Sequence, residues 1–483
     1  MNFRLMPILD LVNQLPAILK ESFSLNDDEC REAVNNIQTF TNGFIPDLWV
    51  GVETCYIDKL YRDAFYNYYS TKLNDYKRNC IRLSFFAGEI TFNDFFSNDK
   101  AIHVQNLFRG FVVIRPTIEN IIGRNVLHPS IIDKYLRYHV STARFSACIY
   151  GIKLWVEGFP HTEQDEEFMV CAETSLWSIM EYFSSRYQEY QPMLPREIHK
   201  ILANTAMERQ VPSTGMNGLQ LSFALKELGF GVKYYLSEQG ELSDLIKIYV
   251  ESSIPLMALL ANDQGIAHVV NIVGRTEFTS EISPTPIKIL PSGSQVLNYY
   301  NRDAKYLLID DNHRAYADVP LEEPACKYSN PEWKGCKIIC IVVPLHKRIY
   351  MEATRAKELA SYALMWLDKI IKLPNICLRL LLSSTRSFKH SIAHNPDLNF
   401  DYKSALINLE MPKFVWIAEI GTHESFAQGK ATGMLLLDAT EPKKNEILAY
   451  LLENRYIGND KAKTPTLFLP LPPFQIHQNL NLF

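Results

Sequence analysis

The sequence predicts an α+β fold in which a buried helix packs against an antiparallel sheet. Three observations favour this class. Apolar residues recur at three- and four-residue spacing in 171–183, which is typical of a helix with one core-facing stripe. Two apolar runs at 254–260 and 266–274 flank a polar turn, which indicates a β-hairpin. A shorter apolar run at 306–309 is followed by two aspartates and is typical of a buried strand.

The chain has 483 residues, which is too long for one ordinary core. We predict an N-terminal α/β region at 1–150, a central domain at 151–345 that holds the three elements above, and a C-terminal α/β extension at 346–483. The hydrophobic content of 47% supports folding throughout the chain. The net charge of −5 gives no general attraction for nucleic acid, so no nucleic-acid partner is expected.

The flanking regions contain further patterns, to which we attach no activity. Helices are predicted at 8–19, 350–371 and 445–454, and strands at 80–86, 111–116, 414–420 and 433–438. Residues 143–157 are typical of one more strand, or of a bent pair of strands around Gly151.

Cys171 is the candidate nucleophile, because it begins the predicted helix. Free backbone N–H groups and the positive end of the helix dipole gather at a helix start, and both favour a thiolate over a thiol. Glu173 opposes part of this effect as a second anion one turn away. The alternative is a buried cysteine that only fills space, so the partners of Cys171 decide between the two.

Two such partners follow in the sequence. His268 stands at the beginning of the second hairpin strand, and Asp310 directly follows the strand at 306–309. A histidine can take the thiol proton and return one to the leaving group, while a carboxylate fixes the ring tautomer and stabilises the imidazolium. We therefore predict a relay of Cys171, His268 and Asp310, with Asp311 and Asn312 competing for the role of the acid.

The stretch from 164 to 312 resembles papain-like cysteine peptidases, most closely the bacterial branch that includes the bacteriocin-leader peptidases of the C39 type. These proteins carry a cysteine that opens the central helix, a histidine preceded by a small residue and followed by two valines, and an acid that closes the next strand. Cys171, the strand start at 267–270 and Asp310 match this order. The segment 215–235 matches the family's helix that leads into a strand. The resemblance implies a papain-like core with large N- and C-terminal additions.

The same family places a glutamine shortly before the cysteine, where its side-chain amide and the cysteine N–H bind the developing oxyanion. Gln164 is the candidate, although it lies one residue further from Cys171 than the family's usual spacing. A solvated loop amide is the alternative. The glycine that commonly accompanies the family's nucleophile is replaced by Ala172, so the resemblance depends on the order of the elements.

The predicted function is a thiol hydrolase that cleaves a peptide, isopeptide or other amide bond in a peptide or protein substrate. An acyltransferase or glutamine deamidase would use the same relay, and an inactive papain-like module would bind a peptide or partner protein. No cofactor or metal is expected. Cys336 and Cys340 lie close to or within an apolar run, and His390 and His394 lack the glutamate of a zinc-peptidase helix.

The sequence also favours a cytoplasmic protein that is not bound to a membrane. Nine cysteines at irregular spacing are typical of reduced thiols. Residues 1–10 lack the cleavage site of a signal peptide, and the apolar stretch at 360–382 contains four charged residues. An effector secreted by a machine that reads other signals would show the same pattern.

One long segment, 275–305, separates the strand of His268 from that of Asp310 and is rich in Pro, Ser, Thr and Asn. Structureless loops longer than about 12 to 15 residues are uncommon unless they serve binding or gating. We therefore predict that this segment overhangs the cleft, with its tip at 292–294, and restricts the entry of substrate.

Overall fold

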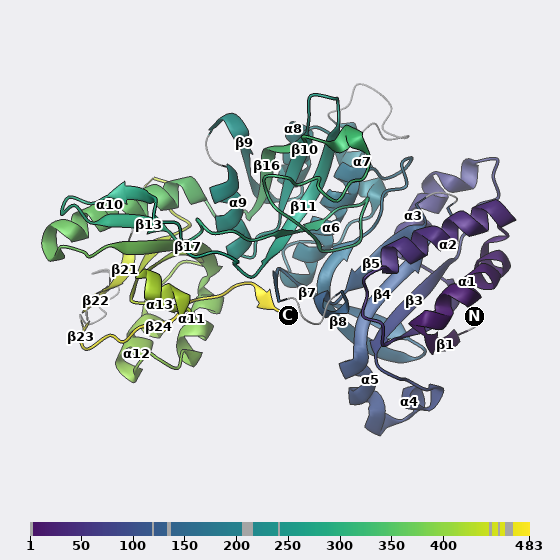
Figure 1. Cartoon of the computed structure of the whole chain (residues 1–483), viewed down its shortest axis with the longest axis horizontal. Helices are drawn as coiled ribbons and strands as arrows, with labels where there is room; N and C mark the ends of the chain where they lie inside the picture. Colours follow the sequence, from purple (N-terminus) through teal and green to yellow (C-terminus); the bar gives the residue numbers. More distant parts are fainter. Residues whose placement is uncertain are drawn as a thin grey trace.

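The computed structural model describes residues 3–117, 120–132, 137–204, 216–239, 242–443, 447–452, 455–458 and 467–483. Its helices and strands form three groups that lie side by side along the long axis (Figure 1). Each group is built around one large sheet, and nearly all strand pairs are antiparallel. The predicted α+β class is therefore confirmed.

The first sheet has seven strands in the order β1-β2-β3-β4-β5-β8-β7. Its strands are Phe3–Pro7 (β1), Leu48–Tyr56 (β2), Cys80–Ala87 (β3), Phe108–Ile114 (β4), Ile122–Leu127 (β5), Ala143–Ile149 (β7) and Ile152–His161 (β8). The helices of this group are Ile8–Phe23 (α1), Asp27–Thr41 (α2), Lys59–Asn67 (α3), Phe92–Phe96 (α4) and Ala101–Leu107 (α5). The helix and strands predicted in this region are confirmed, and 143–157 forms a hairpin that turns at Gly151.

The central sheet has the main order β15-β14-β11-β10-β16-β9, with β6 paired to β11 and β25 paired to β6. Its strands are Tyr138–Val140 (β6), Phe230–Leu236 (β9), Leu256–Ala261 (β10), Ala267–Thr276 (β11), Tyr306–Ile309 (β14), Ala317–Val319 (β15), Lys337–His346 (β16) and Asn481–Leu482 (β25). Its helices are Cys171–Arg186 (α6), Pro195–Ala203 (α7), Gly218–Glu227 (α8) and Leu242–Glu251 (α9). The predicted β10–β11 hairpin is confirmed, as is the passage from α8 into β9, except for residue 215, which lies outside the described residues.

Helix α6 contacts β11 of the central sheet and β7 and β8 of the first sheet. All side chains from 172 to 183 are buried, including polar ones such as Glu173 and Glu181. The predicted apolar stripe is present, but the helix is covered on the opposite side as well. The sequence pattern could not show this, because the second cover comes from strands of another sheet.

The third sheet has the order β12-β13-β17-β18-β20-β21-β22-β23. Its strands are Pro286–Ile289 (β12), Gln295–Asn298 (β13), Ile376–Ser384 (β17), Phe414–Gly421 (β18), Gly433–Asp438 (β20), Ile447–Leu452 (β21), Arg455–Gly458 (β22) and Leu467–Phe468 (β23). A small pair, Lys430–Ala431 (β19) with Phe474–Gln475 (β24), and the helices Ala353–Ile371 (α10), Thr385–His394 (α11), Phe400–Asn408 (α12) and His423–Ala427 (α13) complete this group.

The helix predicted at 445–454 is wrong, because 447–452 forms strand β21, which pairs with β20. Residues 445–446 and 453–454 lie outside the described residues. A short run that is apolar on both faces is compatible with a buried strand and with a buried helix. Here the pairing with β20 makes it a strand.

Some strands of the predicted central domain belong to a neighbouring sheet. Strand β8 belongs to the first sheet, while β12 and β13 belong to the third. The C-terminal strand β25 returns to the central sheet, so the chain ends beside the middle group in Figure 1. The boundaries in the sequence therefore do not coincide with the membership of the sheets.

The tip of the segment 275–305 is bound to the third group and does not overhang the cleft, so the predicted lid at 292–294 is wrong. The two strands of the segment form the edge of the third sheet, where β13 pairs in parallel with β17. At the tip, the Ser292 N–H and hydroxyl each donate to Asp368 of α10 at 2.7 Å, and the Ser294 hydroxyl donates to the Leu373 carbonyl at 2.6 Å. These contacts hold the tip against the third group.

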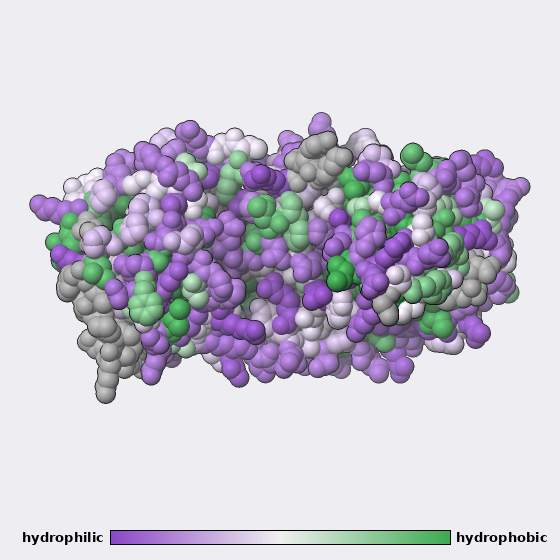
Figure 2. All heavy atoms as spheres, turned by 90° about the horizontal axis from the view of Figure 1, so that it is seen from below, coloured by the Kyte–Doolittle hydropathy of each residue, from purple (hydrophilic) through white to green (hydrophobic). Residues whose placement is uncertain are grey.

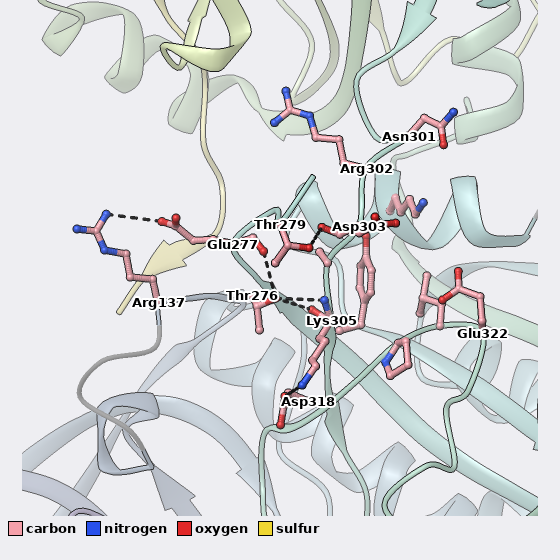
Figure 3. A pocket seen from close by; sticks show the side chains of 15 residues that line it. Arg137, Thr276, Glu277, Thr279, Asn301, Arg302, Asp303, Lys305, Asp318 and Glu322 are labelled. Carbon is pink, nitrogen blue, oxygen red and sulfur yellow. Dashed lines mark hydrogen bonds and ion pairs between the residues drawn. The ribbon is translucent and has the colours of Figure 1, made fainter. Parts of the chain in front are cut away.

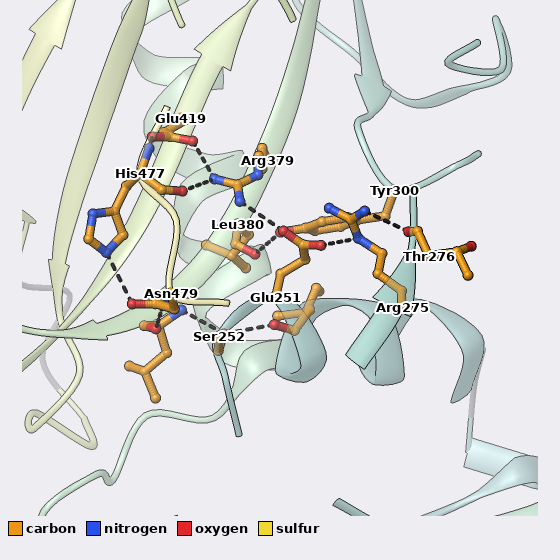
Figure 4. Close-up of polar contacts among 12 residues, drawn as sticks. Glu251, Ser252, Arg275, Thr276, Tyr300, Arg379, Leu380, Glu419, His477 and Asn479 are labelled. Carbon is orange, nitrogen blue, oxygen red and sulfur yellow. Dashed lines mark hydrogen bonds and ion pairs between the residues drawn. The ribbon is translucent and has the colours of Figure 1, made fainter. Parts of the chain in front are cut away.

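A buried network of charged side chains joins the central and third groups (Figure 4). The Arg379 guanidinium donates to Glu419 at 2.7 Å and to Glu251 at 2.8 Å, and Arg275 donates to Glu251 from the other side. The backbone N–H of His477 donates to Glu419 at 2.6 Å, so the C-terminal segment is tied into the same network.

On the face drawn in Figure 2, hydrophilic side chains predominate and hydrophobic ones lie in small groups. This is the usual division in a folded chain whose large apolar residues are mainly inside. None of the helices that the structure describes combines the length and the apolar composition needed to cross a bilayer.

Candidate active site

Cys171 is the first residue of α6, and Val170 precedes it in extended conformation. Its side chain is half-buried and lies close enough to His268 to raise the pKa of that imidazole. The predicted nucleophile thus lies at the positive end of the helix dipole and beside the predicted base. The Cys171 carbonyl accepts a hydrogen bond from the Thr174 hydroxyl at 2.9 Å, which supports the first helical turn.

His268 is the second residue of β11, and its side chain is only 4% exposed. Its Nε2 atom lies 2.9 Å from Asp310 Oδ1. Because Asp310 engages Nε2, the other ring nitrogen is left for the thiol. The structure therefore brings Cys171, His268 and Asp310 into one chain of contacts, in the order that was predicted.

The electrostatic surroundings favour the charged form of this histidine. Burial opposes the imidazolium, but the charge and hydrogen bond of Asp310, the hydrogen bond with Cys171 and the charge of Asp311 outweigh it. Together they raise the pKa of His268 well above its usual value. For Asp310, burial is likewise opposed by His268, and the pKa of the carboxyl is lowered. A buried imidazolium next to an ionised carboxylate is the state that a proton relay uses.

An aromatic pair encloses the contact between His268 and Asp310. The Tyr328 hydroxyl lies 3.0 Å and 2.8 Å from the two Asp310 carboxylate oxygens and 3.3 Å from His268 Nε2. The ring of Tyr328 stacks on Trp333 at 3.6 Å, and Trp333 meets the His268 ring edge to face at 5.2 Å. Sequence reasoning missed both residues, because they lie in an irregular loop between β15 and β16 that carries no periodic pattern.

Asp311 also faces the histidine. Its Oδ1 atom lies 3.6 Å from His268 Nε2 and has no hydrogen-bond partner among the described residues, while Oδ2 accepts from Thr174 at 2.9 Å. Burial, with a smaller effect of the Asp310 charge, raises the pKa of Asp311 to about 7. The shorter distance favours Asp310 as the acid. Both aspartates reach the ring because β14 ends at Ile309 and the chain then turns.

Gln164 lies at the edge of this site. Its side-chain amide donates to Asn312 Oδ1 at 2.7 Å, and the backbone N–H of Asn312 donates to Asp310 at 3.1 Å. Asp165 accepts from three backbone N–H groups in the loop before α6, which holds the loop in place. The structure thus attaches Gln164 to the turn that carries the acid, and its oxyanion role stays a prediction.

Within the described residues, one group of side chains has the composition and spacing of a metal site, and it is His268 with Asp310 and Asp311. Their potential ligand atoms all lie within 4.8 Å of one another. A cation bound there would have to replace the hydrogen bond between His268 and Asp310, which Tyr328 also supports. The arrangement fits a hydrogen-bonded relay better than a metal centre.

Comparison with known proteins assigns no family to this chain. No protein-family model matches it, and no curated protein sequence matches it significantly.

Proposed function

We propose that this chain is a thiol hydrolase of amide bonds, built on a papain-like core, with a peptide or protein as its substrate. The observation that carries the proposal is the chain of contacts from the Cys171 thiol through the His268 ring to the Asp310 carboxylate. Three side chains from a helix start, a hairpin strand and a strand end meet at one point, two of them being nearly inaccessible to water.

In the proposed reaction, the Cys171 thiolate attacks the carbonyl carbon, and a C–S bond forms as the C–O double bond opens to an oxyanion. The Cys171 N–H and the Gln164 amide are the donors proposed for this oxyanion. The C–N bond then breaks, and the His268 imidazolium protonates the leaving amine. A water molecule next gives a proton to His268 and attacks the thioester carbon, and the C–S bond breaks, which releases the acid and restores the Cys171 thiolate beside the His268 imidazolium.

The proposal is tested by the reactivity of Cys171 towards iodoacetamide at pH 5, measured by peptide mass spectrometry for all nine cysteines. Cys55, Cys148 and Cys326 are exposed and serve as internal controls, since they are more accessible than Cys171. We expect Cys171 to react faster than these three, because the neighbouring His268 can take the thiol proton as the sulfur reacts. The advantage should disappear in His268→Ala.

Reaction of Cys171 at or below the rate of the exposed cysteines would contradict the proposal and favour an inactive module that binds peptides. A selectively reactive Cys171 leaves hydrolase and acyltransferase to be separated. Product analysis with and without added primary amines does this, because a transferase forms the new amide and a hydrolase forms the free acid.

A further inference from the structure

A large cavity lies between the central sheet and the third group, with a volume of about 910 Å³ (Figure 3). Its cationic lining residues are Arg137, Lys247, Arg302 and Lys305. A second cavity of about 420 Å³ lies beside the acid of the candidate active site. Its lining includes Asp311 and Asn312. A drug-sized ligand fills a cleft of about 300 to 1,000 Å³, so the two cavities together have room for a longer molecule.

The two cavities meet at Asp318, which lines both of them. Its carboxylate lies 2.9 Å from the Lys305 ammonium on the side of the larger cavity and 3.2 Å from the Lys327 ammonium on the side of the smaller one. Asp318 is the middle residue of β15, which is the edge strand of the central sheet. In the described part of the chain β15 pairs with β14 alone, so its outer backbone groups are left unpaired by the sheet, and an edge of this kind can accept an extended peptide.

Some of the charged side chains that line the larger cavity form ion pairs, and others do not. Arg137 pairs with Glu277 at 3.6 Å and Lys305 pairs with Asp318, whereas Arg302 extends without an ionic contact in Figure 3. Among the described residues no acid pairs with Arg302 or with Lys247, and both side chains are half-buried. A partly buried cation without a counter-ion is unfavourable, which makes an anionic ligand favourable there.

Arg302 is also held in place by aromatic rings. Its guanidinium lies 4.4 Å from the centre of the Tyr299 ring and 5.0 Å from that of Phe278, and its Nε atom has no hydrogen-bond partner among the described residues. The two unpaired acids of the same cavity, Asp303 and Glu322, are exposed to water at the rim. Water therefore solvates both acids, whereas the half-buried Arg302 and Lys247 are solvated only in part.

Two acids of the smaller cavity are only partly ionised at neutral pH. Burial raises the pKa of Glu163 to about 8 and that of Asp311 to about 7, and both residues line this cavity. Arg314 and Lys327 line it as well. The unpaired cations of the larger cavity are thus followed by Arg314 and Lys327 on the way to Asn312, which holds Gln164 beside the active site.

We propose that the two cavities form one groove along β15 that binds an extended peptide segment with acidic side chains and leads it to Cys171. The binding itself depends on the unpaired Arg302 and Lys247, on the edge strand and on the shared residue Asp318. Only the last step, presentation of the segment to the thiol, rests on the proposed function.

The test measures binding to the full-length Cys171→Ala protein by fluorescence anisotropy. The probe is a fluorescein-labelled peptide of about ten residues that carries four glutamates, and the matched peptides carry glutamine or lysine at the same positions. We expect the acidic peptide to bind at least about tenfold more tightly than the glutamine peptide, since hydrogen bonds to charged groups are the stronger ones. Higher salt should weaken this binding.

Variants of the same protein locate the site. Arg302→Gln and Lys247→Gln should each weaken binding of the acidic peptide about tenfold. Arg302→Lys, which keeps the charge, should retain most of the affinity and controls for folding. Lys288→Gln is the matched control, because Lys288 is exposed on β12 and lines neither cavity. Equal affinity for the acidic and glutamine peptides, or no effect of Arg302→Gln, overturns the proposal.

A second measurement tests whether the groove leads to the thiol. In the wild-type protein the acidic peptide should slow alkylation of Cys171 at least fivefold, while the glutamine peptide should not. Binding without protection of Cys171 overturns the single groove. An acid-selective, Arg302-dependent site in a protein whose Cys171 reacts no faster than its exposed cysteines would instead support the groove and contradict the hydrolase.

Discussion

Two buried clusters of charged side chains differ in how completely their members are paired. Between the central and third groups, the two arginines Arg275 and Arg379 alternate with Glu251 and Glu419, and the charges balance (Figure 4). At the start of α6, the single imidazole of His268 faces two carboxylates. In the first cluster each carboxylate pairs with at least one arginine, whereas in the second Asp310 and Asp311 share one imidazole.

Each cluster contains one acid with a lowered pKa and one with a raised pKa. Arg275 and Arg379 outweigh burial and lower the pKa of Glu251 to about 2, and His268 lowers that of Asp310. Burial raises the pKa of Glu419, although Arg379 opposes it, and raises that of Asp311 to about 7. The clusters differ in their partners: Glu419 pairs with a permanently charged guanidinium, whereas Asp311 shares one imidazole with Asp310. A cluster of this second kind beside a thiol can gain and lose protons, which is what catalysis requires.

The largest effect is expected from Asp310→Asn, which keeps the shape of the acid but removes its charge. Loss of the acid in a comparable serine relay reduces turnover about 10⁴-fold, because the histidine takes the wrong tautomer. We expect a decrease of about 10³- to 10⁴-fold in the kcat/KM for amide hydrolysis. A parallel loss of the low-pH reactivity of Cys171 should accompany it. A decrease below tenfold would show that Asp310 is not the acid of the relay.

The matched change in the cluster of Arg275, Arg379, Glu251 and Glu419 is Arg379→Met. It leaves Glu419 without its buried partner. Breaking a buried ion pair from one side costs about 3 to 5 kcal/mol of stability. We expect the free energy of unfolding, measured by urea denaturation, to fall by about this amount. The alkylation rate of Cys171 should not change under native conditions. A change in that rate without a loss of stability would remove the distinction between the two clusters.

Tyr328→Phe should have an intermediate effect on the activity that depends on His268 and Asp310. The hydroxyl positions the Asp310 carboxylate and stabilises its charged form, so its removal raises the pKa of Asp310. We expect kcat to fall about tenfold with KM unchanged. The acidic limb of the pH profile should move to higher pH, which a merely structural role would not cause. Tyr350→Phe is the control, since Tyr350 is 63% exposed and lies outside this cluster.

A further effect concerns the pH dependence of stability in Asp311→Asn. Below the unfolded pKa of about 3.9, the carboxyl is protonated in both states and stability is unaffected. As the pH rises to about 7, the unfolded state ionises first, so the wild type loses stability relative to the variant. Urea denaturation from pH 4 to pH 8 should show a difference that grows up to about pH 7 and then stays constant. Parallel curves for the two proteins would contradict it.

Much of the central region could be predicted from local patterns. The start of α6 at Cys171, the hairpin that carries His268 and the strand that ends before Asp310 follow from apolar periodicity and turn residues. These signals act within about ten residues, so a single sequence is enough to read them. The choice between Asp310 and Asp311 could not be made this way, because the turn after β14 brings both towards His268.

The sequence by itself determined which local elements carry the sulfur, the imidazole and the acids. Only the tertiary structure decided that α6 is covered by two sheets and that 275–305 joins the third sheet. It alone also placed Tyr328 and Trp333 against the relay. The physical reason is that these features depend on backbone pairing and side-chain contacts between residues far apart in the chain. Such contacts leave no periodic trace in either segment.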